Sequence, residues 1–218
     1  MLLKWRHAGQ ACITANRVYV QKGVYDKFAN IIKERTAKLV LGHGSDKNTT
    51  MGPVTTPRSL DKASDQVADA VKRGGQIILG GGRVDGKGGY FFEPTIITGA
   101  TKDMQITQEE TFAPVMALYS FETEDEAVEA ANNTSMGLAS YFFTKNVDRV
   151  WRLYENLEAG MIGMNTGKFL PLLKFLFGNE ADFYTSKVMA PPQKVLLGES
   201  KRVDMEKRVE RMLLLAST

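Results

Sequence analysis

Apolar residues along the first 165 positions recur with two alternating periods, one typical of strands and one typical of helices. Residues 17–21 form a short β-branched and aromatic run, and from residue 24 to residue 39 the apolar positions follow helical spacing. A second helical pattern passes through residues 67–71 and meets the glycine pair that begins at Gly74, which is typical of a helix C-terminus. Residues 76–79 then form a short apolar run that predicts a buried strand.

The same alternation continues to residue 165. Four further runs predict strands: residues 90–98, 114–121, 138–144 and 161–165. Between them, Thr123 and Glu126 form a capping box in front of an alanine-rich helix, and residues 150–157 place apolar side chains on one face of another helix. Strands that alternate with helices in this way favour a parallel sheet with helices on both faces.

This pattern predicts the α/β fold class, with a parallel sheet flanked by helices, in one domain that spans residues 4–167. The strands at residues 76–79, 138–144 and 161–165 are expected to share one sheet. Beyond this domain the alternation is lost, and an aromatic and leucine-rich run is followed by a proline break and a basic stretch. We expect residues 168–218 to form a divergent, poorly ordered tail rather than an interfacial membrane helix, because the apolar stripe of the basic stretch is short.

Composition argues against several classes of partner and site. The chain has 218 residues, a formal net charge of +3, and basic residues interleaved with acidic ones, so we expect no nucleic-acid partner. No apolar run approaches the roughly 20 residues that span a bilayer, so we expect no membrane partner. One cysteine and two histidines supply no ligand set for a Cys/His metal site, and no metal is predicted. The lone cysteine also excludes an internal disulfide, which favours a reducing, cytoplasmic location, or the mitochondrial matrix for a full-length form.

Cys12 is the residue with the most reactive chemistry in the chain. Small residues at Ala8, Gly9 and Ala11 permit close backbone approach around its sulfur. The guanidinium groups of Arg6 and Arg17 would favour the thiolate form of a nearby cysteine. The competing interpretation is that Cys12 is a small buried hydrophobic residue. Spacing alone leaves both interpretations open.

Residues 5–12 resemble the nucleophile signature of aldehyde dehydrogenases, in which an aromatic residue, Arg, Asn, Ala, Gly, Gln, a variable residue and Cys follow one another. Further motifs occur in family order and at family-like spacing: residues 17–21, 51–53, 91–95, 109–114, 136–139 and 161–167. The resemblance covers residues 4–167 and is closest to the succinate-semialdehyde dehydrogenases. It implies that residues 4–167 form an aldehyde dehydrogenase catalytic domain and that the N-terminal cofactor domain is absent from the chain.

The resemblance implies covalent catalysis with NAD or NADP as cofactor, most specifically the oxidation of succinate semialdehyde to succinate in 4-aminobutyrate catabolism. Cys12 would attack this small aldehyde substrate to give a thiohemiacetal and then a thioester, with its own backbone N–H as half of the oxyanion hole. Glu110 and Phe112 match the positions that hold the nicotinamide ribose, although an acidic pair at 109–110 is also typical of a solvated loop. Arg6 matches an arginine that binds the distal carboxylate of the substrate, which suits a guanidinium fork. Lys62 falls where some relatives contact the adenosine ribose, or it is a surface lysine of a helix.

Several departures from the family bear on activity. In the family, an asparagine of the oxyanion hole, a glutamate general base and the dinucleotide-binding fold all precede the cysteine. The glycines between residues 80 and 86 lack the spacing of a dinucleotide-binding loop, so the chain alone is expected to be inactive. His7 and Ala113 replace the usual asparagine and glycine.

The C-terminal segment departs from the family as well. Full-length members are homo-oligomers that pair through a terminal strand, and residues 168–218 contain no recognisable counterpart of it. An altered reading frame or a retained intron would explain the break. Two alternatives to an enzyme follow: a non-catalytic fragment that associates with full-length subunits, and a truncated gene model with no independent role.

Overall fold

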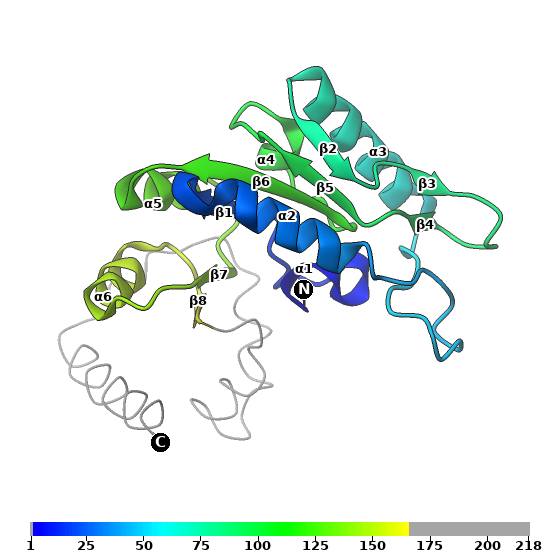
Figure 1. Cartoon of the computed structure of the whole chain (residues 1–218), viewed down its shortest axis with the longest axis horizontal. Helices are drawn as coiled ribbons and strands as arrows, with labels where there is room; N and C mark the ends of the chain where they lie inside the picture. The colour runs from blue at the N-terminus through cyan, green and yellow to red at the C-terminus, as the bar shows by residue number, and fades with distance from the viewer. Residues whose placement is uncertain (1, 166–218) are drawn as a thin grey trace.

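The computed structural model describes residues 2–165, which form a central sheet with helices packed against it (Figure 1). The strands are β1 (Arg17–Gln21), β2 (Gln76–Leu79), β3 (Arg83–Val84), β4 (Phe91–Phe92), β5 (Thr95–Thr98), β6 (Val115–Phe121), β7 (Ala139–Phe142) and β8 (Met161–Met164). The helices are α1 (Leu2–Trp5), α2 (Tyr25–Thr36), α3 (Pro57–Lys72), α4 (Gln105–Gln108), α5 (Glu124–Asn132) and α6 (Val147–Asn156), with short 3-10 helices η1 (Arg6–Gly9) and η2 (Lys22–Val24). The expectations for residues 168–218 lie outside the described residues.

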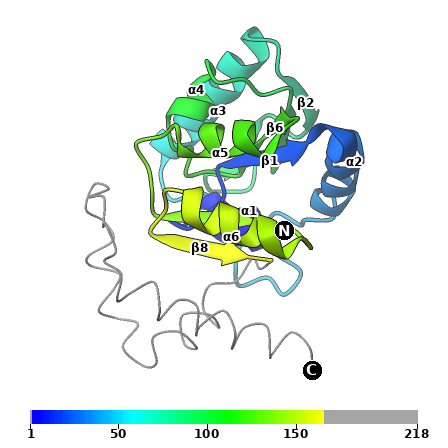
Figure 2. The same ribbon diagram turned by 90° about the vertical axis from the view of Figure 1, so that its left-hand side faces the viewer.

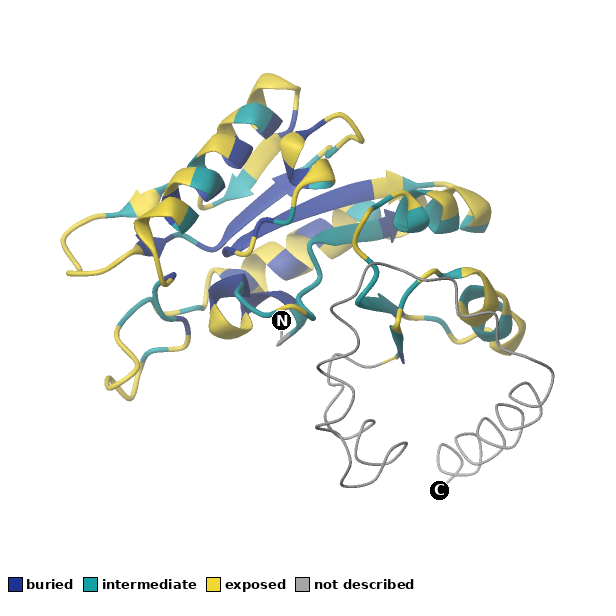
Figure 3. Cartoon of the chain, turned by 180° about the vertical axis from the view of Figure 1, so that it is seen from behind, coloured by how far each residue is buried: buried dark blue, intermediate teal, exposed yellow. Residues whose placement is uncertain are grey.

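The central sheet has the strand order β1-β6-β5-β2. β6 pairs in parallel with β1 on one side and with β5 on the other, while β2 joins β5 antiparallel. Residues 115–118 of β6 are buried in succession, because helices cover both faces of the sheet. Figure 2 shows α2 on one face and α3 on the opposite face, and Figure 3 shows the buried residues concentrated along the strands between them. The predicted α/β class with flanking helices is confirmed.

The prediction that the strands at residues 76–79, 138–144 and 161–165 share one sheet is wrong. β7 and β8 pair in parallel with each other in a separate two-stranded sheet, whereas β2 belongs to the central sheet. Apolar periodicity predicts that each strand exists, but it does not specify a pairing partner. The central sheet is also not wholly parallel. The residues between β2 and β5 form the β3–β4 hairpin rather than a crossover helix, which parallel neighbours require.

Burial and proline correct two strand predictions. The run at residues 76–79 is not a buried strand, because β2 lies at the sheet edge and Ile77 is 39% exposed. The strand expected over residues 90–98 divides into β4 and β5, which are separated by Glu93 and Pro94. Proline has no N–H to donate to a ladder, so it ends a strand that apolar residues alone would continue.

The helix α2 begins and ends close to the predicted range but presents a different face to the core. It buries Ala29 and Ile32, whereas Phe28 and Ile31 are exposed. The apolar positions therefore predict the helix correctly and its orientation only in part, because the sheet selects which side is covered.

The signals at helix ends mark the predicted ends, although the return bond of the Thr123–Glu126 capping box goes to the N–H of Glu122 rather than to that of Thr123. Gly74 adopts a φ of 92° just beyond α3, the left-handed conformation that glycine tolerates best. The Thr123 side chain accepts a hydrogen bond from the Glu126 N–H over 3.2 Å, and the Glu126 carboxylate accepts one from the Glu122 N–H over 2.9 Å. Within residues 2–165, no helix has the length and apolar character to cross a membrane, and no group of three or more His, Cys, Asp or Glu side chains is placed to hold a metal ion.

Candidate active site

Cys12 follows a turn with an unusual backbone conformation. Three successive residues have positive φ angles: His7 at 52°, Ala8 at 53° and Gly9 at 76°. For the two residues that carry side chains, the left-handed conformation costs roughly 1–2 kcal/mol each. Such strain persists only where the surrounding structure holds it, and it is concentrated at functional sites. Beyond the turn Cys12 is exposed, so the interpretation of it as a buried hydrophobic residue is wrong.

Tyr141 of β7 connects the β7–β8 sheet to the residue directly after Cys12. Its hydroxyl donates a hydrogen bond to the carbonyl oxygen of Ile13 over 2.8 Å. Burial raises the pKa of Tyr141, the guanidinium of Arg6 opposes this rise, and Cys12 adds to it. Arg6, the predicted carboxylate-binding arginine, and Cys12, the predicted nucleophile, therefore both act electrostatically on this phenol.

The segment with Glu110 and Phe112 lies against the Cys12 turn. A side-chain carbon added at Gly9 would stand 2.8 Å from the carbonyl carbon of Ala113, so the two backbones are in contact and only glycine fits. Glu110 is half-buried, whereas Phe112 is 40% exposed and has a positive φ of 50°. The predicted cofactor-binding residues therefore neighbour the turn that presents Cys12.

Lys4 is a charged residue buried beneath this region. Its side chain is almost fully covered, and its ammonium group donates to the Asn16 side-chain oxygen over 3.3 Å. Burial lowers the pKa of Lys4 to about 7, and the negative charge of Glu110 opposes this shift. Sequence reasoning missed Lys4, because lysines are rarely buried. The one sequence feature that could have indicated a role for Lys4 is its position directly before Trp5, the first residue of the signature.

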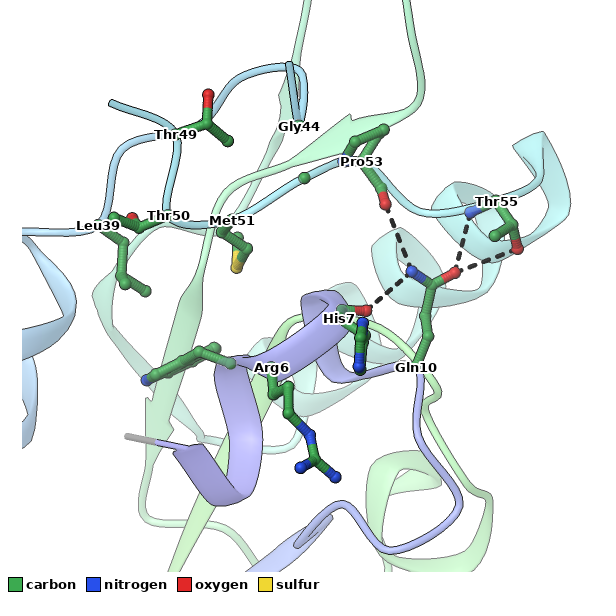
Figure 4. Close-up of a pocket in the computed structure, with 12 residues that line it drawn as sticks. Arg6, His7, Gln10, Leu39, Gly44, Thr49, Thr50, Met51, Pro53 and Thr55 are labelled. Carbon is green, nitrogen blue, oxygen red and sulfur yellow. Dashed lines mark hydrogen bonds between the residues drawn. The ribbon is translucent and has the colours of Figure 1, made fainter. Parts of the chain in front are cut away.

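Gln10 joins the Cys12 turn to the loop between α2 and α3 (Figure 4). Its amide nitrogen donates to the carbonyl oxygens of His7 over 2.9 Å and of Pro53 over 3.3 Å. Its amide oxygen accepts from the backbone N–H of Thr55 over 2.9 Å and from the Thr55 hydroxyl over 3.1 Å. Sequence reasoning gave Gln10 no role beyond membership of the signature.

A hollow of about 760 Å³ opens beside this bridge, between the turn and the α2–α3 loop (Figure 4). Trp5 and Arg6 contribute from the turn, and residues 49–53 contribute from the loop. The indole N–H of Trp5 is buried and has no hydrogen-bond partner within residues 2–165. Cys12 is not one of the residues that line the hollow, so the hollow borders the candidate site rather than forming its centre.

Two other basic residues from the sequence analysis are held elsewhere. Arg17 donates to the carbonyl oxygens of Ala130 and Ala131 over 3.0 Å each, at the C-terminal end of α5, where a positive charge is favourable. Its guanidinium is thus committed to a helix end, which leaves Arg6 as the basic group that interacts with the surroundings of Cys12. Lys62 of α3 forms an ion pair of 3.6 Å with Glu109, and both side chains are exposed, as the surface interpretation expects.

Comparison with known proteins finds a matching family model and many relatives. Residues 2–179 match the aldehyde dehydrogenase family. The succinate-semialdehyde dehydrogenase (NADP+) 1 of Schizosaccharomyces pombe is 46% identical over 167 residues, which are 77% of this chain and 34% of that protein. The 3-sulfolactaldehyde dehydrogenase of Pseudomonas putida is 45% identical over 166 residues, with 76% of this chain and 34% of that protein covered. The chain therefore spans about a third of the length of these relatives.

Solved structures give the same result. The succinate-semialdehyde dehydrogenase of Burkholderia pseudomallei matches with a TM-score of 0.74 and 41% identity, over 76% of this chain and 34% of that one. The betaine aldehyde dehydrogenase of Staphylococcus aureus, solved in complex with NAD+, matches with a TM-score of 0.72 and 38% identity, over 75% of this chain and 33% of that one.

Proposed function

Because this chain belongs to the aldehyde dehydrogenase family, we propose that it supplies the nucleophile-bearing part of an enzyme that oxidises an aldehyde to a carboxylic acid with NAD or NADP. The observation that carries the proposal is the strained turn at His7–Gly9, which precedes an exposed Cys12 and contacts the segment of Glu110 and Phe112. Strain of this kind has to be maintained by surrounding contacts, which favours a role in presenting a reactive group.

Cys12 is the nucleophile in this proposal. Its thiolate attacks the aldehyde carbon, a sulfur–carbon bond forms, and the carbonyl oxygen becomes an oxyanion that the backbone N–H of Cys12 stabilises. Glu110 and Phe112 would hold the nicotinamide cofactor, which would supply a hydride acceptor for that carbon. The thioester that results on Cys12 is hydrolysed by water, which releases the acid and restores the thiol.

Glu110 and Phe112 fit the binding of a nicotinamide ribose. A carboxylate accepts hydrogen bonds from ribose hydroxyls, and Glu110 retains access to solvent because it is only half-buried. Phe112 presents 40% of its surface from the same segment, so its ring is available for contact with a bound cofactor. Since the chain spans about a third of its relatives' length, we expect it to need the remainder of a full-length family polypeptide for turnover.

Arg6 determines substrate class in this proposal, through a carboxylate at the far end of the aldehyde. Its exposed guanidinium interacts with the same tyrosine as Cys12, which supports a substrate that reaches from the sulfur to Arg6. Relatives at 40–46% identity are named for succinate semialdehyde, glutarate semialdehyde and 3-sulfolactaldehyde, all of which carry an acid group. Succinate semialdehyde is the substrate that we propose.

The test is a hybrid polypeptide in which residues 2–165 replace the matching segment of the S. pombe relative. With succinate semialdehyde, the hybrid is expected to form NADPH or NADH, and Cys12→Ser is expected to abolish this. Arg6→Met is expected to lower kcat/KM for succinate semialdehyde by about 10- to 100-fold, the loss of a charge-assisted hydrogen bond, and to leave kcat/KM for uncharged butanal nearly unchanged. Activity that survives Cys12→Ser rejects the nucleophile, and equal losses for both aldehydes reject the role of Arg6.

A further inference from the structure

The strained turn before Cys12 needs contacts that hold it in place. His7 and Ala8 both occupy the left-handed region, and nothing in a free peptide would favour this for residues with side chains. On one side, Gly9 contacts the backbone of Ala113, which blocks movement in that direction. This contact is steric and prevents closer approach, but it does not pull the turn toward any partner.

Gln10 provides the attractive contacts on the other side. A primary amide has two N–H donors and an oxygen with two lone pairs, and all four are used here. The two donors bond to His7 and Pro53, and the oxygen accepts twice from Thr55 (Figure 4). The side chain therefore closes the turn on itself through His7 and fastens it to a loop more than forty residues away in sequence.

We infer that Gln10 is a positioning residue, which fixes the orientation of the Cys12 sulfur and backbone N–H by clamping the left-handed turn to residues 53–55. The inference rests on the proposed role of Cys12 as nucleophile. Gln10 lies two residues before Cys12 and acts through the backbone, so it does not have to contact the substrate. Its effect should therefore fall on steps that need the sulfur and the N–H to be correctly oriented together.

Two reactions of the intact 218-residue chain separate orientation from simple access, because Cys12 is its only thiol. In the first, the thiolate attacks 4-nitrophenyl acetate, a sulfur–carbon bond forms, the ester carbon–oxygen bond breaks, and 4-nitrophenolate leaves with the electron pair. This acylation passes through an oxyanion that the backbone N–H stabilises. In the second, the thiolate displaces iodide from iodoacetamide, which requires an accessible thiolate and develops no oxyanion.

The measured quantity is the ratio of the acylation rate constant to the alkylation rate constant. Gln10→Met keeps the length of the side chain but removes all four hydrogen bonds, and it is expected to lower this ratio about 10-fold, a fraction of the 10²–10³ lost when an oxyanion donor is removed. Gln76→Met, the same change on the exposed edge strand β2, is the matched control and should leave the ratio unchanged. A role limited to general stability would move both rate constants together and leave the ratio constant.

A second pair of variants keeps the test decisive if Gln10→Met does not fold. Thr55→Val removes the hydroxyl that donates to Gln10, whereas Thr55→Ser retains it. The ratio is expected to fall about 2- to 3-fold in the valine variant, in line with the loss of one modest hydrogen bond, and to remain at the wild-type value in the serine variant.

The outcomes distinguish this inference from the proposed function. A normal ratio in folded Gln10→Met, or equal ratios in the two Thr55 variants, overturns the positioning role and leaves the nucleophile assignment intact. If Cys12→Ser releases nitrophenolate as fast as the wild-type chain, the nucleophile is rejected, and the role of Gln10 is rejected with it.

Discussion

Replacing Lys4 by methionine removes a charge that the fold buries beneath the Cys12 turn. The lysine is 1% exposed, its ammonium group donates to Asn16, and the negative charge of Glu110 acts on it. Burial opposes the protonated form more strongly than Glu110 favours it, so the pKa of Lys4 falls from the ordinary 10.5 to about 7. Methionine has a similar length and no charge, which makes the variant a direct test of this cost.

The size of the change in the free energy of unfolding follows from the difference in proton binding between the folded and unfolded chains. A fall of the pKa from 10.5 to about 7 corresponds to about 5 kcal/mol of cost when the lysine is charged. Below about pH 7 both states bind the proton and this cost is fully present. As the pH rises, the folded state releases the proton first, so the free energy of unfolding increases. Between about pH 6 and about pH 9 the wild type should gain about 3 kcal/mol relative to Lys4→Met.

The assay is urea unfolding at several pH values across that window, with wild type, Lys4→Met and the exposed-site control Lys38→Met. Titration of other groups contributes equally to all three proteins and cancels in the differences. The curve for Lys4→Met should diverge from wild type with the stated slope, and that for Lys38→Met should run parallel to wild type. Parallel curves for all three proteins would show that Lys4 keeps its ordinary pKa in the folded state, which would refute the burial argument.

Three further predictions concern the contacts around the site and the stability of α5. Gly9→Ala should destabilise the fold by at least roughly 2 kcal/mol, because it adds a side chain at positive φ that overlaps Ala113; an unchanged midpoint of thermal unfolding would contradict this. Tyr141→Phe should cost about 1 kcal/mol by removing the hydrogen bond to Ile13, and hydrogen exchange should quicken in β7 but not in β6. Glu124 of α5 pairs with two arginines of α6, and the hydrogen bond from Arg152 is the main reason that its pKa falls from 4.5 to about 2. Glu124→Gln should therefore lower the free energy of unfolding by roughly 1 kcal/mol at neutral pH. That loss should disappear as the pH falls from about 4.5 to about 2, and a loss that persists in acid would show that charge is not its cause.

Local features of the sequence were sufficient to predict most elements and to propose a nucleophile. The helix α3 ends at Lys72, two residues before Gly74, and the helix α5 begins directly after its N-cap Thr123, as their sequence signals indicate, because capping depends on residues within one helical turn. The signature at residues 5–12 likewise indicates Cys12 directly. These features could be read in advance because their physical causes lie between neighbouring residues.

Strand pairing, long-range hydrogen bonds and burial depend on residues far apart in the chain, and only the tertiary structure shows them. Pairing of β7 with β8 in a separate sheet, and the exposed edge position of β2, could not be read from apolar periodicity, because any strand offers the same backbone groups to several partners. Gln10 acts through Pro53, which lies 43 positions away, and only folding brings the two together. The burial of Lys4 also depends on the fold, since it is 1% exposed and the charge of Glu110, far away in the sequence, acts on it.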